Sequence, residues 1–276
     1  MRALKRKSKE SIPVHAILVL IGFFQILPVL VLFINTLRTD SQIKVAPLGI
    51  PDRLDFTNYI ETWVQGAFGF AFRNSIGIGI FTILIVLFCA NLAAYALVKL
   101  KIKHEGFFLG YFTLGMTIPA FLYIVPDYFL FHKVGLGNSL VGITIIYSAM
   151  YLPFNVLLIR TFLIGIPKEL EEAGRIDGCN ELRILWYITV PLSRPILTTV
   201  SVIVFVWTWN EFLWANTFLQ NDQVRTVATK FYKFTGEYSQ DLAKTFTAGA
   251  IALVPIIILY LLLQKTFIEG ITQGGL

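Results

Sequence analysis

The sequence predicts an all-α polytopic membrane protein in which six transmembrane helices form one domain. Of its 276 residues, 56% are hydrophobic and only 14% are charged, whereas soluble domains carry about 25% charged residues. The mean hydropathy is +0.70, and long uncharged runs occupy most of the chain. These runs are continuous rather than alternating every second residue, which excludes the strands of a membrane β-barrel.

A helix needs about 20 apolar residues to cross the hydrocarbon core of a bilayer. The first such run follows a basic tail, residues 1–13. It exceeds a typical signal-peptide core and no small-residue cleavage site follows it, so we expect it to remain as a span. Prolines at 119, 126 and 153 are expected to kink spans within the bundle. The six predicted spans are residues 14–34, 74–98, 106–131, 134–159, 195–221 and 245–264, within a transmembrane domain of residues 14–276.

The distribution of Lys and Arg predicts the orientation of these spans. Cytoplasmic loops of membrane proteins carry an excess of Lys and Arg. If the amino terminus is cytoplasmic, 14 of the 23 basic residues fall on the cytoplasmic side and 9 on the outside. Five of them lie in the 13-residue tail, against four in the longer first outside loop. Both termini are therefore predicted to be cytoplasmic.

Residues 166–191, between the fourth and fifth spans, are predicted to form a short helix, a turn and a second helix. Pro167 suits a first helical position, and Gly178 suits a left-handed residue that ends the helix. Asn180 can cap the second helix, which Pro191 is expected to end. Acidic side chains stabilise the amino-terminal end of a helix, which carries a partial positive charge. Three glutamates lie near the predicted start of the first helix: Glu169, Glu171 and Glu172. One face of that helix carries Leu170, Ala173, Gly174 and Asp177.

Small residues on that face would let another backbone approach closely. The pattern alone fits equally well an amphipathic hairpin that lies on the membrane surface without a partner.

A family resemblance favours the first interpretation. Glu172-Ala173-Gly174, Asp177-Gly178 and Ile188-Thr189-Val190-Pro191 together resemble the EAA loop of ABC importer permeases. Gly174 stands where alanine is usual in that loop, and Val190 where leucine is usual. The resemblance implies that the loop is a coupling helix inserted into a groove of a cytoplasmic ATPase subunit. The residues it assigns to coupling are Glu169, Leu170, Glu172, Ala173, Gly174, Asp177, Gly178 and Pro191.

Further motifs resemble the carbohydrate-uptake branch of these permeases, the maltose and glycerol-phosphate type. They are Met116–Pro119, Tyr151–Phe154, Ile166-Pro167, Trp209–Phe212 and the segment 264–274. Relatives often run a few residues beyond the last glycines, so the ending at Leu276 is expected to be slightly short.

This resemblance implies a permease subunit in a bacterial or archaeal cell membrane that imports a sugar or oligosaccharide. The implied partners are a second permease subunit, usually in a heterodimer, two cytoplasmic ATPase subunits and an extracytoplasmic solute-binding protein. ATP and Mg belong to the partner ATPase, and this chain is expected to bind no cofactor.

Polar groups inside the predicted spans are candidates for the substrate path, because such groups usually face the interior of a helix bundle. Besides Asn74 and Asn91, they are Asn155, Asn210 and Glu211, and Trp209 could stack on a sugar ring. Glu211 could instead make a structural ion pair or a hydrogen bond between helices. The tryptophans at 207, 209 and 214 fit an aromatic belt at the membrane surface better than a sugar site.

The sequence gives no sign of catalysis by this chain. It contains no phosphate-binding loop, no HExxH motif and no serine elbow. Neither its two cysteines nor its three histidines have metal-site spacing. We therefore expect no catalytic residues, no metal and no nucleic-acid partner. The alternatives are an ABC permease for another solute, such as glycerol phosphate or a polyamine, an ion-coupled secondary transporter, and an intramembrane enzyme.

Overall fold

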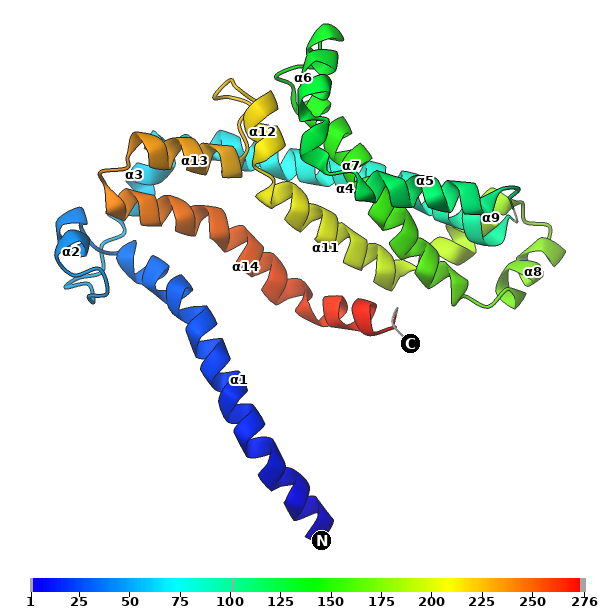
Figure 1. Ribbon diagram of the computed structural model, residues 1–276, viewed down its shortest axis with the longest axis horizontal. Coiled ribbons are helices and arrows are strands. Elements are labelled where there is room, and N and C mark those ends of the chain that lie inside the picture. Colours follow the sequence, from blue (N-terminus) through cyan, green and yellow to red (C-terminus); the bar gives the residue numbers. More distant parts are fainter. Residues whose placement is uncertain (1, 101, 274–276) are drawn as a thin grey trace. The chain divides into compact units, whose positions relative to one another are not determined.

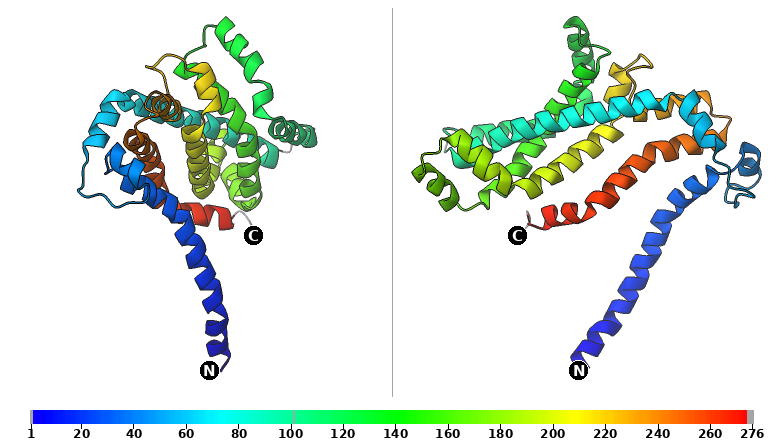
Figure 2. Two further views of the ribbon diagram at one scale, coloured as in Figure 1. Left: turned by 60° about the vertical axis from the view of Figure 1, so that its left-hand side comes forward. Right: turned by 180° about the vertical axis from the view of Figure 1, so that it is seen from behind.

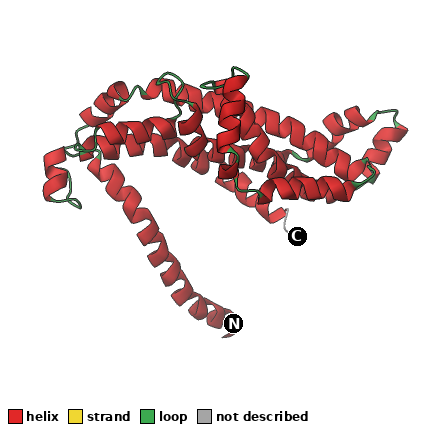
Figure 3. Ribbon diagram, turned by 45° about the horizontal axis from the view of Figure 1, so that its top comes forward, coloured by secondary structure: helices red, strands yellow, loops and turns green. Residues whose placement is uncertain are grey.

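The computed structural model describes residues 2–100 and 102–273, and the side chains of residues 13–100, 102–262 and 264. Throughout these ranges the chain consists of helices and connecting loops without strands (Figure 3). The predicted all-α class is thus confirmed. The side chains of the basic tail up to residue 12, and the end of the chain at 274–276, lie outside the described residues.

Four helices are long and apolar enough to cross a membrane. They lie in α1 (Arg2–Asn35), α4 (Phe68–Lys99), α7 (Leu140–Ile164) and α14 (Leu242–Gln273) (Figure 1). A fifth crossing is possible where Glu181–Leu192 and α11 (Arg194–Asn210) meet at a bend of 78°. The described residues therefore supply four continuous spans and one bent pair of helices.

The third predicted span, residues 106–131, is interrupted in the structure. It consists of α5 (Glu105–Thr117), the 3₁₀ turn η1 (Ala120–Leu122) and α6 (Ile124–Lys133). Pro119 explains the interruption, because it has no backbone N–H and disfavours the helical conformation of the residue before it. Ile118 is accordingly extended, with ψ 120°.

Two other predicted spans have different ends. The helix predicted from residue 134 begins only at Leu140, after a loop in which Gly135 and Asn138 have positive φ angles of 76° and 51°. The helix predicted to reach residue 221 ends at Asn210. A separate short helix, α12 (Leu213–Phe218), follows it.

The described residues form two compact units, residues 2–68 with 231–254 and residues 69–100 and 102–230 with 255–273. In the first unit, Arg38 is buried between α1 and α2 (Asp40–Val45). It donates hydrogen bonds to the side chain of Asn35 and the carbonyl of Gln42, both at 2.8 Å. The first turn of α14 joins this group, because the backbone N–H of Leu242 donates to Asp40 at 2.8 Å. The unit also contains α3 (Thr57–Gln65).

The second unit has one apolar core shared by α4, α7 and α11. Ala90 and Ala94 of α4 are fully buried in it, and small residues at such positions let helices approach closely. α5 packs alongside α7, and both can be followed in the two views of Figure 2. The core extends to the segment after α7, where Ile184 and Leu185 are also fully buried. This packing fixes the position of residues 166–191, the segment with the most informative motif.

Candidate functional site

Residues 166–191 form a helical hairpin, as predicted. The first helix is α8 (Glu169–Ile176), and Gly178 follows it in a left-handed conformation with φ 81°. Only glycine adopts this conformation without steric cost. Asn180 caps the second helix, because its side chain accepts the backbone N–H of Arg183 at 2.9 Å. We refer to residues 166–191 as the hairpin.

The second half of the hairpin differs from the prediction at Pro191. It consists of α9 (Glu181–Ile184), the π-helical segment η2 (Leu185–Thr189) and α10 (Val190–Leu192). Pro191 thus lies within a helical segment and does not end it. In an α-helix, the ring of a proline clashes sterically with the carbonyl group four residues earlier. The wider π turn before Pro191, in which Val190 donates to the carbonyl of Leu185, relieves that contact.

The two faces of α8 are not equivalent. Leu170, Ala173 and Asp177 are exposed, as a surface for another protein requires. Gly174, predicted to share that face, is buried against the second half of the hairpin. A Cβ atom at this position would lie 2.7 Å from Cδ1 of Ile188. Glycine at 174 therefore allows the two halves of the hairpin to pack against each other.

A buried ion pair connects the hairpin to α4. Nζ of Lys99, the last residue of α4, lies 2.8 Å from a carboxylate oxygen of Glu171 in α8, and the two side chains are 2% and 3% exposed. Lys99 also donates to the carbonyl of Ile166 at 3.0 Å. A buried pair needs close contact and additional hydrogen bonds to offset its desolvation. Lys99 has such a hydrogen bond, whereas Glu171 is stabilised by the two cations alone, Lys99 and, at 3.9 Å, Arg175. Glu171 was predicted only as a helix-start signal, and no sequence pattern marked Lys99 as a site residue.

A second polar contact reinforces this connection. Tyr95, one turn before Lys99, donates its hydroxyl to Glu181 at 2.7 Å. Arg175 of α8 donates two hydrogen bonds to the same carboxylate, at 2.8 and 3.2 Å. Hydrogen bonds from Arg175 and Tyr95 lower the pKa of Glu181, and the Glu181 carboxylate raises the pKa of Arg175. Further along α4, the ring of Phe88 stacks on Trp186 of η2 with centroids 6.2 Å apart.

The candidate substrate-path residues make contacts within the chain. Asn155 is fully buried in α7 and donates to the carbonyl of Tyr151 at 2.8 Å. Trp209 is buried in α11, with its ring 5.5 Å from Phe72. Asn210 is exposed and donates to a carbonyl of its own helix at 2.8 Å. Of these residues, Asn210 is the one with an exposed amide.

Glu211 joins three helices. It ends α11, and its carboxylate accepts the backbone N–H groups of Trp214 and Ala215 at 2.9 and 3.0 Å, at the start of α12. It also accepts the hydroxyl of buried Tyr147 of α7 at 2.5 Å. The structure therefore shows a hydrogen bond between helices, which was one of the alternatives predicted for this residue.

The tryptophan cluster is divided between the core and the surface. Trp209 and Trp214 are buried within the chain, which argues against both as members of an aromatic belt. Trp207 is 37% exposed and lines an apolar groove of about 330 Å³ with Val206, Leu259 and Tyr260. Among the three, only Trp207 could offer a substantial ring surface to a ligand or to lipid.

The loop of residues 219–226 joins α12 to α13 (Val227–Glu237) and is tied to the first turns of α4. Nδ2 of Asn74 donates to the carbonyls of Gln223 and Arg225 at 2.8 and 3.0 Å. The hydroxyl of Ser75 accepts the backbone N–H of Val227 at 2.9 Å. We refer to residues 219–226 as the α12–α13 loop.

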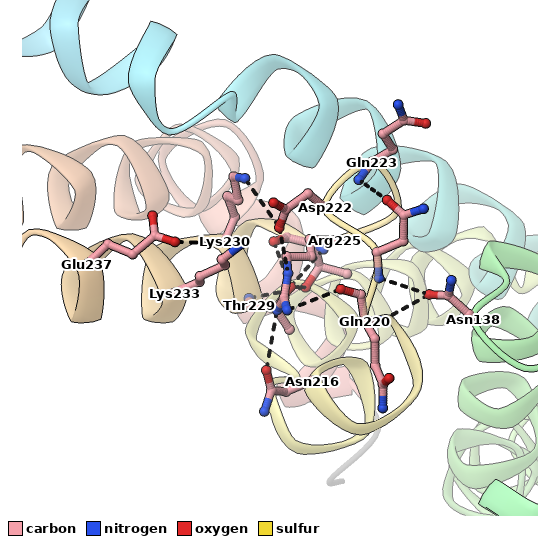
Figure 4. A network of polar contacts seen from close by, with 12 residues as sticks. Asn138, Asn216, Gln220, Asp222, Gln223, Arg225, Thr229, Lys230, Lys233 and Glu237 are labelled. Atoms are coloured by element: carbon pink, nitrogen blue, oxygen red, sulfur yellow. Dashed lines mark hydrogen bonds and ion pairs between the residues drawn. The ribbon is translucent and has the colours of Figure 1, made fainter.

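Side chains from within the α12–α13 loop and from Asn138, in the loop before α7, also hold it (Figure 4). Arg225 donates to the carboxylate of Asp222 at 3.1 Å and to the carbonyl of Gln220 at 3.3 Å. The side chain of Asn138 accepts the backbone N–H groups of Gln220 and Asn221 at 3.0 and 3.1 Å. The loop is therefore an ordered structure with a defined attachment to α4.

Comparison with known proteins gives the same family as the resemblance of the hairpin to the EAA loop. Residues 87–273 match the family described as binding-protein-dependent transport system inner membrane component. The chain is 32% identical over its full length, and over 99% of the relative, to the melibiose/raffinose/stachyose import permease protein MelC of Bacillus subtilis. It is 30% identical to the trehalose transport system permease protein SugB of Mycobacterium tuberculosis, covering 91% of this chain and 92% of the relative.

The fold has a close counterpart among solved structures. It matches a chain of a bacterial ABC transporter involved in the import of the acidic polysaccharide alginate, with a TM-score of 0.82. The match covers 95% of this chain and 98% of the other, at 24% sequence identity. The same helical arrangement therefore persists although three quarters of the aligned residues differ.

Proposed function

The chain belongs to the family of binding-protein-dependent transport system inner membrane components, and from this membership we propose that it is the permease subunit of an ABC importer for a sugar or oligosaccharide. The observation that carries the proposal is the full-length similarity to an import permease for melibiose, raffinose and stachyose. A relative in Streptomyces coelicolor is a diacetylchitobiose uptake permease, 28% identical over 94% of this chain, which supports the same substrate class.

In this proposal the hairpin docks on a cytoplasmic ATPase subunit. The exposed face of Leu170, Ala173 and Asp177 offers the contact surface, and the exposed Glu169 and Glu172 flank it. Gly178 and Pro191 shape the hairpin, through the left-handed turn and the π-helical segment. ATP and Mg bind to the ATPase, so this chain performs no chemistry and transmits movement instead.

The proposed importer contains further subunits. A second permease chain, in a heterodimer, would complete the translocation path, and an extracytoplasmic solute-binding protein would deliver the sugar. A second similar solved structure is that of a bacterial alginate ABC transporter in complex with a pentasaccharide-bound periplasmic protein, which supports such an assembly. The complex would lie in a bacterial or archaeal cell membrane with both termini of this chain cytoplasmic.

Within the proposed path, the four candidate residues have different roles. Asn210 could meet the sugar directly, because its amide is exposed. The other three residues would support the wall of the path without contacting the sugar, because each is hydrogen-bonded or packed within the chain: Asn155, Trp209 and Glu211.

The test begins with affinity purification of this chain from its native membrane in mild detergent, followed by mass identification of the proteins that accompany it. We expect an ATPase and a second permease. The recovered complex is then reconstituted with its binding protein and tested for uptake of melibiose, raffinose, trehalose and diacetylchitobiose.

Three outcomes would decide against the proposal. Recovery of neither partner from an intact preparation would indicate a transporter of another class. Uptake abolished by a protonophore but not by ATP depletion would indicate ion coupling. Stimulation of ATP hydrolysis by glycerol phosphate or a polyamine, and by none of the sugars, would place the chain in another branch of ABC permeases.

A further inference from the structure

The end of α4 that carries Lys99 is fastened to the hairpin although the two are far apart in sequence. The hairpin is covalently continuous with α7 and α11, and Ile184 and Leu185 also pack in the core that it shares with those helices. Its attachment to α4 has no covalent link and depends on side chains of α4. Lys99 pairs with Glu171 and donates to the carbonyl of Ile166, Tyr95 donates to Glu181, and Phe88 stacks on Trp186. Displacing the hairpin without α4 would separate Lys99 from Glu171, and a charge that loses its partner while still buried is strongly unfavourable.

The opposite end of α4 is fastened to the α12–α13 loop. Asn74 donates to two carbonyls of the loop, and Ser75 accepts the first backbone N–H of α13. Both side chains are almost fully buried, at 1% and 2% exposed. These hydrogen bonds join the carboxyl-terminal part of the loop to α4, while Asn138 holds Gln220 and Asn221 in its amino-terminal part.

Between its two attachments, α4 is uninterrupted. Residues 74 to 99 span about 38 Å at 1.5 Å per residue, more than the roughly 30 Å of a bilayer core. Among the described helices longer than 20 residues, α4 alone contains no proline, whereas Pro28, Pro153 and Pro255 lie inside α1, α7 and α14. Proline is a main cause of sharp helix bends, so α4 is suited to move as one rod.

We propose that α4 transmits movement between the hairpin and the α12–α13 loop, with Lys99 and Asn74 as positioning residues at its two ends. This inference rests on the proposed function, because the movement begins when the ATPase subunits close on the hairpin. It connects ATP use on the cytoplasmic side to the loop on the outer side of the membrane, at the opposite end of the same helix.

The test uses a thiol reporter on the loop in the purified, reconstituted transporter with its ATPase, second permease and binding protein. Cys89 and Cys179 are replaced by serine, and Gln223→Cys introduces a thiol, because that side chain is exposed. The rate of labelling by a membrane-impermeant maleimide is measured with and without ATP and vanadate. We expect the parent protein to show at least a fivefold change in rate, and Lys99→Met and Asn74→Leu each to reduce it below twofold.

Two matched controls separate this role from a general structural one. Lys103→Met removes an exposed lysine four residues after Lys99. Asn91→Leu removes a buried amide of α4 that donates only to a carbonyl of its own helix, at 2.7 Å. Both are expected to retain the full ATP-dependent change, and so is the conservative variant Lys99→Arg.

The double variant Lys99→Met/Asn74→Leu provides the most specific readout. If both residues serve one line of transmission, the double variant loses no more of the change than the more affected single variant. The proposal would be overturned if the double variant lost the product of the two single-variant losses in the ATP-dependent labelling change. It would also be overturned if Lys99→Met showed a normal ATP-dependent change. The absence of any change in the parent protein when the ATPase copurifies would overturn it as well.

Failure of the variants to fold is distinguishable from loss of transmission. Copurification of the ATPase and basal ATP hydrolysis should stay within twofold of the parent protein. If Lys99→Met does not assemble, the double variant Lys99→Met/Glu171→Leu replaces both members of the buried pair and so leaves no uncompensated charge. Retention of the labelling change in that variant would refute a need for the ion pair. Absence of an ATPase from the parent preparation would contradict the proposed function itself.

Discussion

Gly174 controls how closely the two halves of the hairpin approach. Its missing Cβ atom would meet the end of the Ile188 side chain, which can rotate, and not backbone. An alanine, the residue usual at this place in the EAA loop, would therefore displace only a flexible group. It would also gain about 1 kcal/mol of helix propensity over glycine. A larger side chain cannot be accommodated in this way.

We predict that Gly174→Ala changes transport less than twofold, whereas Gly174→Leu opens the hairpin. Overpacking a tight contact costs about 1–3 kcal/mol, enough to separate α8 from η2. Limited trypsin digestion at Arg175 should then be at least fivefold faster in Gly174→Leu than in the parent protein. Equal digestion of both variants would show that this contact does not hold the hairpin closed.

Glu181 makes the attachment of the hairpin dependent on pH. Hydrogen bonds from Arg175 and then Tyr95 lower its pKa below the ordinary 4.5. A group with a lowered pKa in the folded state stabilises the protein above its unfolded pKa and loses that contribution as the pH falls through the folded value. The attachment is therefore complete at neutral pH and weakens only below about pH 4.5.

We predict that Glu181→Gln imitates acidification. At pH 7 the variant should unfold about 1–3 °C below the parent protein, a small effect because the pair with Arg175 is partly exposed. The difference should disappear as the pH falls below 4.5 toward the folded pKa. Unfolding temperatures of the purified complex from pH 8 to about pH 3 provide the measurement, and a difference that grows with acidity would contradict the assignment.

At the scale of elements, local sequence signals predict the hairpin well and its surroundings less well. Gly178 and Asn180 act on their own backbone, so the turn and the second cap could be located from the sequence. The π turn before Pro191 and the break near Pro119 depend on how a proline is accommodated by its neighbours. A proline signals that a helix must adjust, but packing decides whether it bends, widens or stops.

We predict that Ala173→Arg abolishes uptake, by at least tenfold, while membrane insertion stays normal. Ala173 is exposed, so the new side chain can extend into solvent beside Glu169 and Asp177 without disturbing the packing of the hairpin. It is a better test than a charge at Gly178, where the left-handed backbone would strain any other residue. Ala173→Ser is the matched control. Normal uptake by Ala173→Arg would exclude docking through this face.

At the scale of the whole molecule, composition and apolar runs predict an all-α membrane protein, because both follow from the bilayer as solvent. The pairs that join distant elements could not be predicted in this way. Lys99 and Glu171 lie 72 positions apart, and nothing in the sequence of either segment marks the other as its partner. The sequence shows Asn74 only as a polar residue in a predicted span, and its hydrogen bonds to the α12–α13 loop arise from the fold.

Both proposals depend on the orientation of the chain in the membrane. The 14 basic residues expected inside, against 9 outside, predict that the hairpin lies in the cytoplasm. In a protein lacking Cys89 and Cys179, single cysteines at the exposed positions Leu48 and Lys168 report the two sides. An impermeant maleimide should label Leu48→Cys in intact cells at least tenfold more than Lys168→Cys, and permeabilisation should equalise them. The reverse labelling pattern would place the hairpin on the extracytoplasmic side. An ATPase could not then bind the face that carries Ala173, and its closure could not move α4 through Lys99.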